Sequence, residues 1–133
     1  MPLPLTQTLE SPSNKIPLQN VLIGYSRTST SHSQDLMRQV VQLKEVGCTQ
    51  IFTDQISSLT DYKDREGLSK CLEELEEGNV LVISELSRLG RSLVEMIVQV
   101  NNLLERNIGV KTLDGRLDTT SMPPEIVKLV VAV

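Results

Sequence analysis

Short segments of strand character alternate with longer segments of helical periodicity, and this alternation constrains the fold more than any other feature. The short segments are predicted to be strands at residues 21–25, 50–54, 80–83 and 109–113. The longer segments are predicted to be helices at residues 34–46, 65–77 and 87–107. This pattern implies an α/β fold of three layers, in which helices cover both faces of a mostly parallel sheet.

The two ends of the chain differ in composition from its middle. Residues 1–20 hold four of the six prolines and are predicted to be a disordered leader. Residues 21–133 are predicted to be one domain, because 133 residues suit a single compact unit. Pro123 and Pro124 are predicted to open a last helix, which stops where the sequence ends at Val133.

Composition excludes several classes of protein. The net charge of −4 argues against a protein that coats DNA, and one Phe, two Tyr and no Trp argue against a single-strand binder. The core is therefore expected to be aliphatic. We find neither a membrane-spanning apolar run nor a secretory signal, so a cytoplasmic protein without membrane contact is expected. Cys48 and Cys71 match no metal spacing and are expected to be free thiols.

Basic side chains follow three of the predicted strands. Arg27 follows the first strand, Arg65 follows the second after a loop, and Arg88 and Arg91 follow the third. Since the carboxyl ends of parallel strands meet at one edge of a sheet, we expect these four arginines to converge there. Arginine is the preferred planar partner of phosphate, and Ser29 beside Arg27 is a candidate nucleophile.

Each of these features also has a plainer explanation. Arg88 and Arg91 fall in the first turn of a predicted helix, against its dipole, which favours a shared anionic target. They are otherwise solvated arginines paired with Glu85 and Glu95. Ser29 is otherwise a loop residue, because His32 lacks an acid to orient it.

Acidic residues near these arginines are interpreted without a metal. Asp54, Asp61 and Asp64 are predicted to form turns and to orient arginines. No cluster of Asp and Glu in the sequence indicates a metal site.

Several segments in order along the chain resemble one known family. Residues 25–30 (YSRTST) resemble the Tyr-x-Arg-x-Ser-Thr signature of the resolvases and DNA invertases, which are serine recombinases. Residues 85–92 (ELSRLGRS) resemble the strongest family block. Weaker matches are residues 34–39, 51–54, 64–68 and 117–119. The resemblance covers residues 21–133 and implies the catalytic domain of that family.

The resemblance implies a DNA recombination or integration activity. Ser29 would attack the scissile phosphate, leaving a 5′-phosphoserine link and a free 3′-hydroxyl. The four arginines would bind the phosphate, stabilise the transition state and help to move protons. Gln34 and Asp54 would support the site. Neither a metal nor ATP is implied as a cofactor, because the covalent link conserves the energy for rejoining.

The resemblance also implies partners, and departures from it define the alternatives. Double-stranded DNA and a homodimer or tetramer are implied, with assembly and DNA binding weakened because the last helix stops at Val133. Ser87 stands where many members have Asp, and residues 69–77 are acidic where some relatives are more basic.

Two alternatives remain open at this point. The first is a recombinase-like remnant that binds protein without catalysis. The second is a binder of small phosphate compounds, which the lack of a Gly-rich phosphate loop disfavours.

Overall fold

A computed structural model describes residues 21–29, 33–56, 65–90 and 92–123 of the chain. Its strands are β1 (Leu22–Thr28), β2 (Gln50–Gln55), β3 (Val80–Ile83) and β4 (Gly109–Thr112). Its helices are α1 (Ser33–Glu45), α2 (Glu66–Glu74), the short 3-10 helix η3 (Leu86–Leu89) and α3 (Leu93–Glu105). The strands form one parallel sheet in the order β2-β1-β3-β4.

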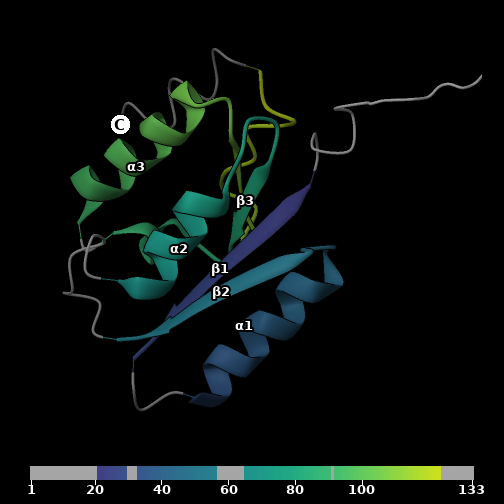
Figure 1. The fold of residues 1–133 in the computed structure, drawn as a ribbon, viewed down its shortest axis with the longest axis vertical. Coiled ribbons are helices and arrows are strands. Elements are labelled where there is room, and N and C mark those ends of the chain that lie inside the picture. The colour runs from purple at the N-terminus through teal and green to yellow at the C-terminus, as the bar shows by residue number, and fades with distance from the viewer. Residues whose placement is uncertain (1–20, 30–32, 57–64, 91, 124–133) are drawn as a thin grey trace, which may run out of the picture.

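Helices cover both faces of this sheet, which confirms the predicted fold class (Figure 1). The helix α1 packs against β1 and β2 on one face, whereas α2 and α3 lie on the other. Along β1, Leu22 joins the core under α1, while Ile23 and Tyr25 join the core under α2 and α3. Every residue of β3 is buried, because both of its faces are covered.

The core is aliphatic, as predicted. Tyr25 is the only aromatic side chain among the buried residues that the structure describes, and Phe52 packs against the core from a partly buried position. Cys71 is buried and Cys48 is half-buried, and both are free thiols, as the sequence predicted.

Two helices end where local geometry stops them. After α1, Gly47 adopts a φ of 105°, which favours glycine, and its N–H donates to the Lys44 carbonyl at 3.0 Å. The helix α2 ends at Glu74, three residues earlier than predicted. Leu75 takes an extended conformation there and is only 2% exposed, so it leaves the helix to enter the core.

The predicted single helix over residues 87–107 is wrong. The structure has η3, then an extended Gly90, and then α3, whose N-cap is Ser92. The Ser92 side chain accepts a hydrogen bond from the Glu95 N–H at 3.2 Å, which starts α3 afresh. Arg88 therefore lies in η3 and not in the first turn of a long helix, so the helix-dipole argument fails for it.

Several predictions fall on residues outside the described ranges. These concern the leader over residues 1–20, His32, Asp61, Asp64, Arg91 and the helix that begins near Pro123. Within the described ranges, no helix is both long and apolar enough to cross a membrane.

Candidate active site at the carboxyl edge of the sheet

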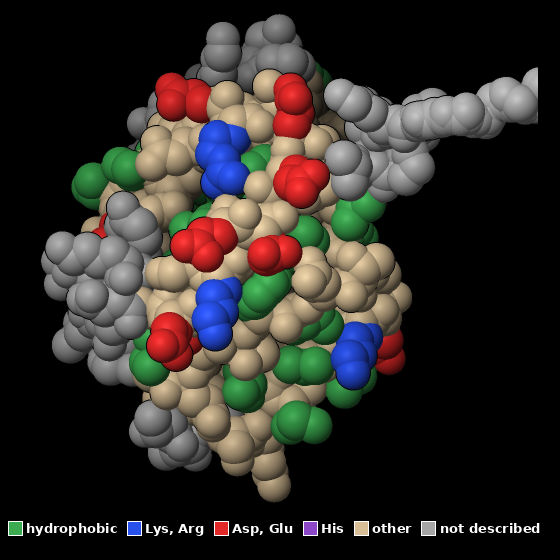
Figure 2. Space-filling view, in the orientation of Figure 1, with side chains coloured by type: hydrophobic (Ala, Val, Ile, Leu, Met, Phe, Trp, Pro, Cys, Tyr) green, Lys and Arg blue, Asp and Glu red, His purple; other side chains and the backbone are tan. Residues whose placement is uncertain are grey.

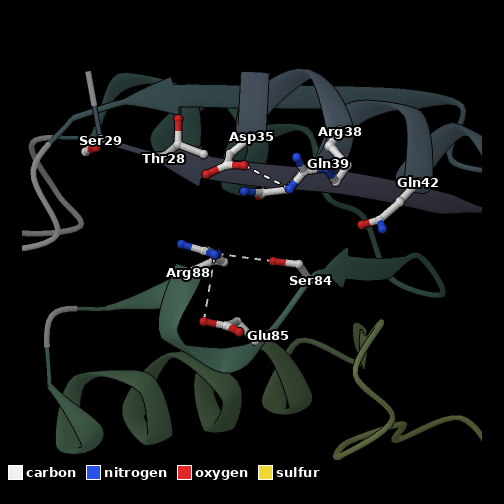
Figure 3. A pocket seen from close by; sticks show the side chains of 9 residues that line it. All are labelled: Thr28, Ser29, Asp35, Arg38, Gln39, Gln42, Ser84, Glu85 and Arg88. Carbon is white, nitrogen blue, oxygen red and sulfur yellow. Dashed lines mark hydrogen bonds and ion pairs between the residues drawn. The ribbon is translucent and has the colours of Figure 1, made fainter. Parts of the chain in front are cut away.

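The carboxyl ends of β1, β2 and β3 meet at one edge of the sheet, where most of the predicted site residues lie. Arg27 and Asp54 are direct partners across β1 and β2. A cavity of about 510 Å³ opens beside the ends of β1 and β3. Its lining residues are Thr28, Ser29, Asp35, Arg38, Gln39, Gln42, Ser84, Glu85 and Arg88 (Figure 3).

Ser29 and Arg88 contribute to the same cavity from different elements. Ser29 directly follows β1 and is half-buried. Arg88 comes from η3 and lies across the cavity from Thr28 and Asp35 (Figure 3). The structure thus brings the Ser29 hydroxyl and the Arg88 guanidinium group to the lining of one cavity.

Arg27 is buried close to two other arginines. Its side chain is 6% exposed, and its Nε atom has no hydrogen-bond partner among the described residues. Burial lowers the pKa of Arg27, and the charges of Arg88 and Arg65 lower it further. Positive charge from three arginines therefore gathers where β1 ends, and Glu85 offsets part of it.

Arg65 is fully buried at the start of α2. Its Nη1 atom donates a hydrogen bond to the Arg88 carbonyl oxygen at 2.8 Å, which ties α2 to η3. Arg65 has no exposed surface and does not line the cavity, and its contact with the cavity runs through the backbone of Arg88.

Asp54 fixes the position of α2 relative to the sheet. Its Oδ1 accepts from the Gly67 N–H at 2.8 Å, and its Oδ2 accepts from the Leu68 N–H at 3.0 Å and the Tyr25 hydroxyl at 2.7 Å. The carboxylate therefore satisfies two free N–H groups at the start of α2. Burial, and then Asp54, raise the pKa of Tyr25, which keeps its hydroxyl protonated as a donor.

Gly67 permits the close approach of α2 to β2. A Cβ atom at this position would lie 2.2 Å from the Thr53 carbonyl oxygen and 2.9 Å from Asp54 Oδ1. The contact that places Arg65 therefore depends on the absence of a side chain two residues later.

Arg88 is held more loosely than Arg65. Its Nε donates to Ser84 Oγ at 3.1 Å, and its Nη2 lies 3.8 Å from Glu85 Oε1. Glu85 also accepts a hydrogen bond from the Ser87 hydroxyl. Ser84 and Glu85 thus set the direction of Arg88 without enclosing it.

The structure separates Gln34 from the cavity and brings in Gln39 instead. Gln34 is exposed in the first turn of α1 and does not line the cavity. Gln39 is 7% exposed and donates from Nε2 to the Arg27 carbonyl oxygen at 3.4 Å. The sequence held a signal for it, because Gln39 falls between Leu36 and Leu43 on the buried face of the helix.

Charge is not gathered into a basic surface on the face shown in Figure 2. Acidic and basic side chains of the described residues are intermingled there. Among the described residues, no group of three or more His, Cys, Asp or Glu is arranged to hold a metal ion.

Comparison with known proteins gives the same family from sequence. The family description "Resolvase, N terminal domain" matches residues 22–132. The serine recombinase gin of Escherichia phage Mu is 41% identical over 102 residues, which cover 76% of this chain and 51% of gin. The Tn1546 resolvase of Enterococcus faecium is 34% identical over 103 residues, which cover 77% of this chain and 52% of the relative. The chain thus spans about half the length of these relatives.

Solved structures share the fold at low sequence identity. The first open reading frame of a Sulfolobus solfataricus P2 transposon has a TM-score of 0.61 and 22% identity, over 79% of this chain and 73% of that one. The C-terminal catalytic domain of an IS607-like serine recombinase has a TM-score of 0.59 and 19% identity, and the match covers 69% of this chain and 68% of that one. These two structures share the fold, and the family match over residues 22–132 establishes that the chain belongs to the resolvase family of serine recombinases and corresponds to its N-terminal domain.

Proposed function

We propose that this domain cuts and rejoins DNA with Ser29 as its nucleophile. The observation that carries the proposal is that Ser29 and Arg88 line one cavity. Beside it lies Arg27, whose pKa is lowered by burial and then by the charges of Arg88 and Arg65. A serine beside clustered arginines fits attack on a phosphodiester, whose transition state is stabilised mainly by positioning and charge.

The proposed reaction exchanges one phosphate ester for another. Ser29 Oγ loses its proton and forms a bond to phosphorus, while the bond from phosphorus to the 3′-oxygen breaks. The 3′-oxygen takes up one proton in place of the proton that Ser29 released, so a 5′-phosphoserine link and a free 3′-hydroxyl result. Attack by a 3′-hydroxyl on the phosphoserine reverses these steps and rejoins the strand.

The arginines take different parts in this proposal. Arg88 contacts the phosphate, because its side chain is 22% exposed and lines the cavity. Arg27 adds buried positive charge beside the cavity, close to Arg65 and Arg88, which would stabilise the transition state. Arg65 adds charge and holds the Arg88 backbone. Arg91 is proposed as a further phosphate contact on the resemblance alone.

The remaining proposals follow from the family. We propose Asp54 and Gln34 as supporting residues, double-stranded DNA as substrate, and homodimers or tetramers as the assembled forms. The cytoplasm is the proposed compartment. The division into a leader over residues 1–20 and a domain over residues 21–133 also stays a proposal.

A chimaera tests the nucleophile. Residues 22–132 would replace the matching region of the phage Mu relative, to be incubated with the DNA site of that recombinase. We expect a covalent protein–DNA adduct on denaturing gels, lost in Ser29→Ala and kept in the matched control Ser33→Ala. Arg88→Ala is expected to slow adduct formation at least about 100-fold.

The outcomes separate the rival functions. An adduct that persists in Ser29→Ala would remove Ser29 from the nucleophilic role. A chimaera that assembles on DNA but forms no adduct would favour the non-catalytic interaction domain.

A further inference from the structure

The guanidinium groups of Arg27, Arg65 and Arg88 lie at the carboxyl edge of the sheet. The nearby carboxylates differ in how many of their oxygens already have hydrogen-bond or ion-pair partners. Both oxygens of Asp54 are engaged by Tyr25 and the start of α2. Asp35 is paired with Arg38 at 2.9 Å. Among the described residues that line the cavity, Glu85 is the carboxylate that faces Arg88.

The contact between Glu85 and Arg88 has the geometry of a replaceable ion pair. Their closest atoms are 3.8 Å apart, which is too long for a hydrogen bond. The two side chains are 49% and 22% exposed, respectively, so water screens the attraction. Figure 3 shows Ser84, Glu85 and Arg88 together on the side of the cavity opposite Thr28 and Asp35.

Ser87 holds the Glu85 carboxylate beside Arg88. Its hydroxyl donates to the same Oε1 atom that faces Arg88 Nη2. Ser84 meanwhile holds Arg88 through Nε, so the terminal nitrogens carry the contact with Glu85. The same terminal nitrogens are the ones that a phosphate would engage.

From this geometry we infer that Glu85 is an internal counter-ion that occupies Arg88 at rest and competes with a phosphate for it. The inference deepens the proposed function and rests on it, since it concerns the same arginine. Its consequence is specificity: isolated anions bind weakly, and a phosphodiester held by further contacts displaces the carboxylate. A residue that merely oriented Arg88 would have the opposite effect on anion affinity.

Inorganic phosphate is the probe, added to the chain of 133 residues at constant ionic strength. Nitrogen-15 NMR of the arginine Nε–H groups reports binding, with the Arg88 signal assigned by its loss in Arg88→Ala. We expect Glu85→Gln to lower the apparent Kd for phosphate about two- to five-fold, the range for one partly exposed ion pair. Glutamine keeps the acceptor for Ser87 and removes only the charge.

A matched control separates local from general charge effects. Glu74→Gln removes the same charge from an exposed position on α2, away from the cavity lining. Its phosphate affinity should equal that of the parent. An equal gain in both variants, no gain in Glu85→Gln, or weaker binding in Glu85→Gln would each overturn the inference.

Ser87 provides a second test. Ser87→Ala should release Glu85 and give a smaller gain in affinity. In the Glu85→Gln background the same change should add nothing, because no charge remains to be held. Additive effects would contradict the role given to Ser87.

Arg88→Ala distinguishes this inference from the proposed function. If Arg88→Ala loses phosphate binding while Glu85→Gln leaves it unchanged, the counter-ion role of Glu85 is rejected and the phosphate-binding role of Arg88 is kept. If Arg88→Ala binds phosphate as the parent does, both fail together.

Discussion

The two corners of the arginine cluster are built in contrasting ways. In the Asp54 corner, comprising Tyr25, Asp54, Gly67 and Leu68, three short hydrogen bonds meet on one buried carboxylate. In the Arg88 corner, comprising Ser84, Glu85, Ser87 and Arg88, the contacts are partly exposed and the ion pair is long. The first corner therefore fixes the geometry, and the second is where we propose that a phosphate replaces the carboxylate.

The largest expected effect is on the Asp54 corner. Asp54→Ala leaves two backbone N–H groups and the Tyr25 hydroxyl without their acceptor, so we expect the free energy of unfolding to fall by about 3 kcal/mol or more. Urea denaturation measures it. Asp54→Asn keeps one acceptor oxygen, so its free energy of unfolding should fall less than that of Asp54→Ala. A loss below about 1 kcal/mol in Asp54→Ala would show that the corner is not rigid.

Gly67→Ala tests the close approach of α2. The new methyl would lie 2.2 Å from the Thr53 carbonyl oxygen, so α2 must move away from β2. We expect a loss of about 1–3 kcal/mol in thermal unfolding. Glu66→Ala, at an exposed position in the same turn, is the control and should change stability far less. An equal loss of stability in Gly67→Ala and Glu66→Ala would mean that α2 and β2 are not in close contact at Gly67.

Tyr25→Phe removes one donor from the same carboxylate and changes the response to pH. We expect a loss of about 1 kcal/mol at neutral pH. Folding raises the pKa of Tyr25 above its ordinary value of 10.0, so the folded state holds this proton more tightly. Its contribution is thus fully present below pH 10.0 and lost as the pH rises above it. Stability of the parent should therefore fall more steeply above that pH than stability of the variant, and parallel curves would contradict the assignment.

The smallest effect is expected in the Arg88 corner. Ser84→Ala removes the hydrogen bond to Arg88 Nε, which is only partly buried, so we expect at most about 1 kcal/mol. Thermal unfolding measures this loss, with Asp54→Ala as the reference. A cost equal to that of Asp54→Ala would abolish the distinction between the two corners.

Features set by local sequence were predictable. The β3 strand and the stop of α1 at Gly47 follow from residues within a few positions of one another. The break before α3 was also encoded locally, because Ser92 and Glu95 have the spacing of a capping box. It was missed because the apolar periodicity continues across Gly90.

Features set by contacts between distant segments were not predictable. The convergence of Arg27, Arg65 and Arg88 followed from sheet topology, but the burial of Arg65 did not. Asp54 was predicted to orient arginines, yet its link to α2 depends on how closely Gly67 approaches β2. The place of Gln39 on the buried face of α1 could be predicted, but its hydrogen bond to the Arg27 carbonyl oxygen depends on how α1 packs against β1.

In the proposed reaction the hydroxyl of Ser29 becomes bonded to DNA. The most direct measurement is tandem mass spectrometry of the chimaera's adduct after nuclease digestion, which identifies the residue that carries the remaining nucleotide. We predict the 5′-phosphate on Ser29. A nucleotide on any other residue would contradict the account.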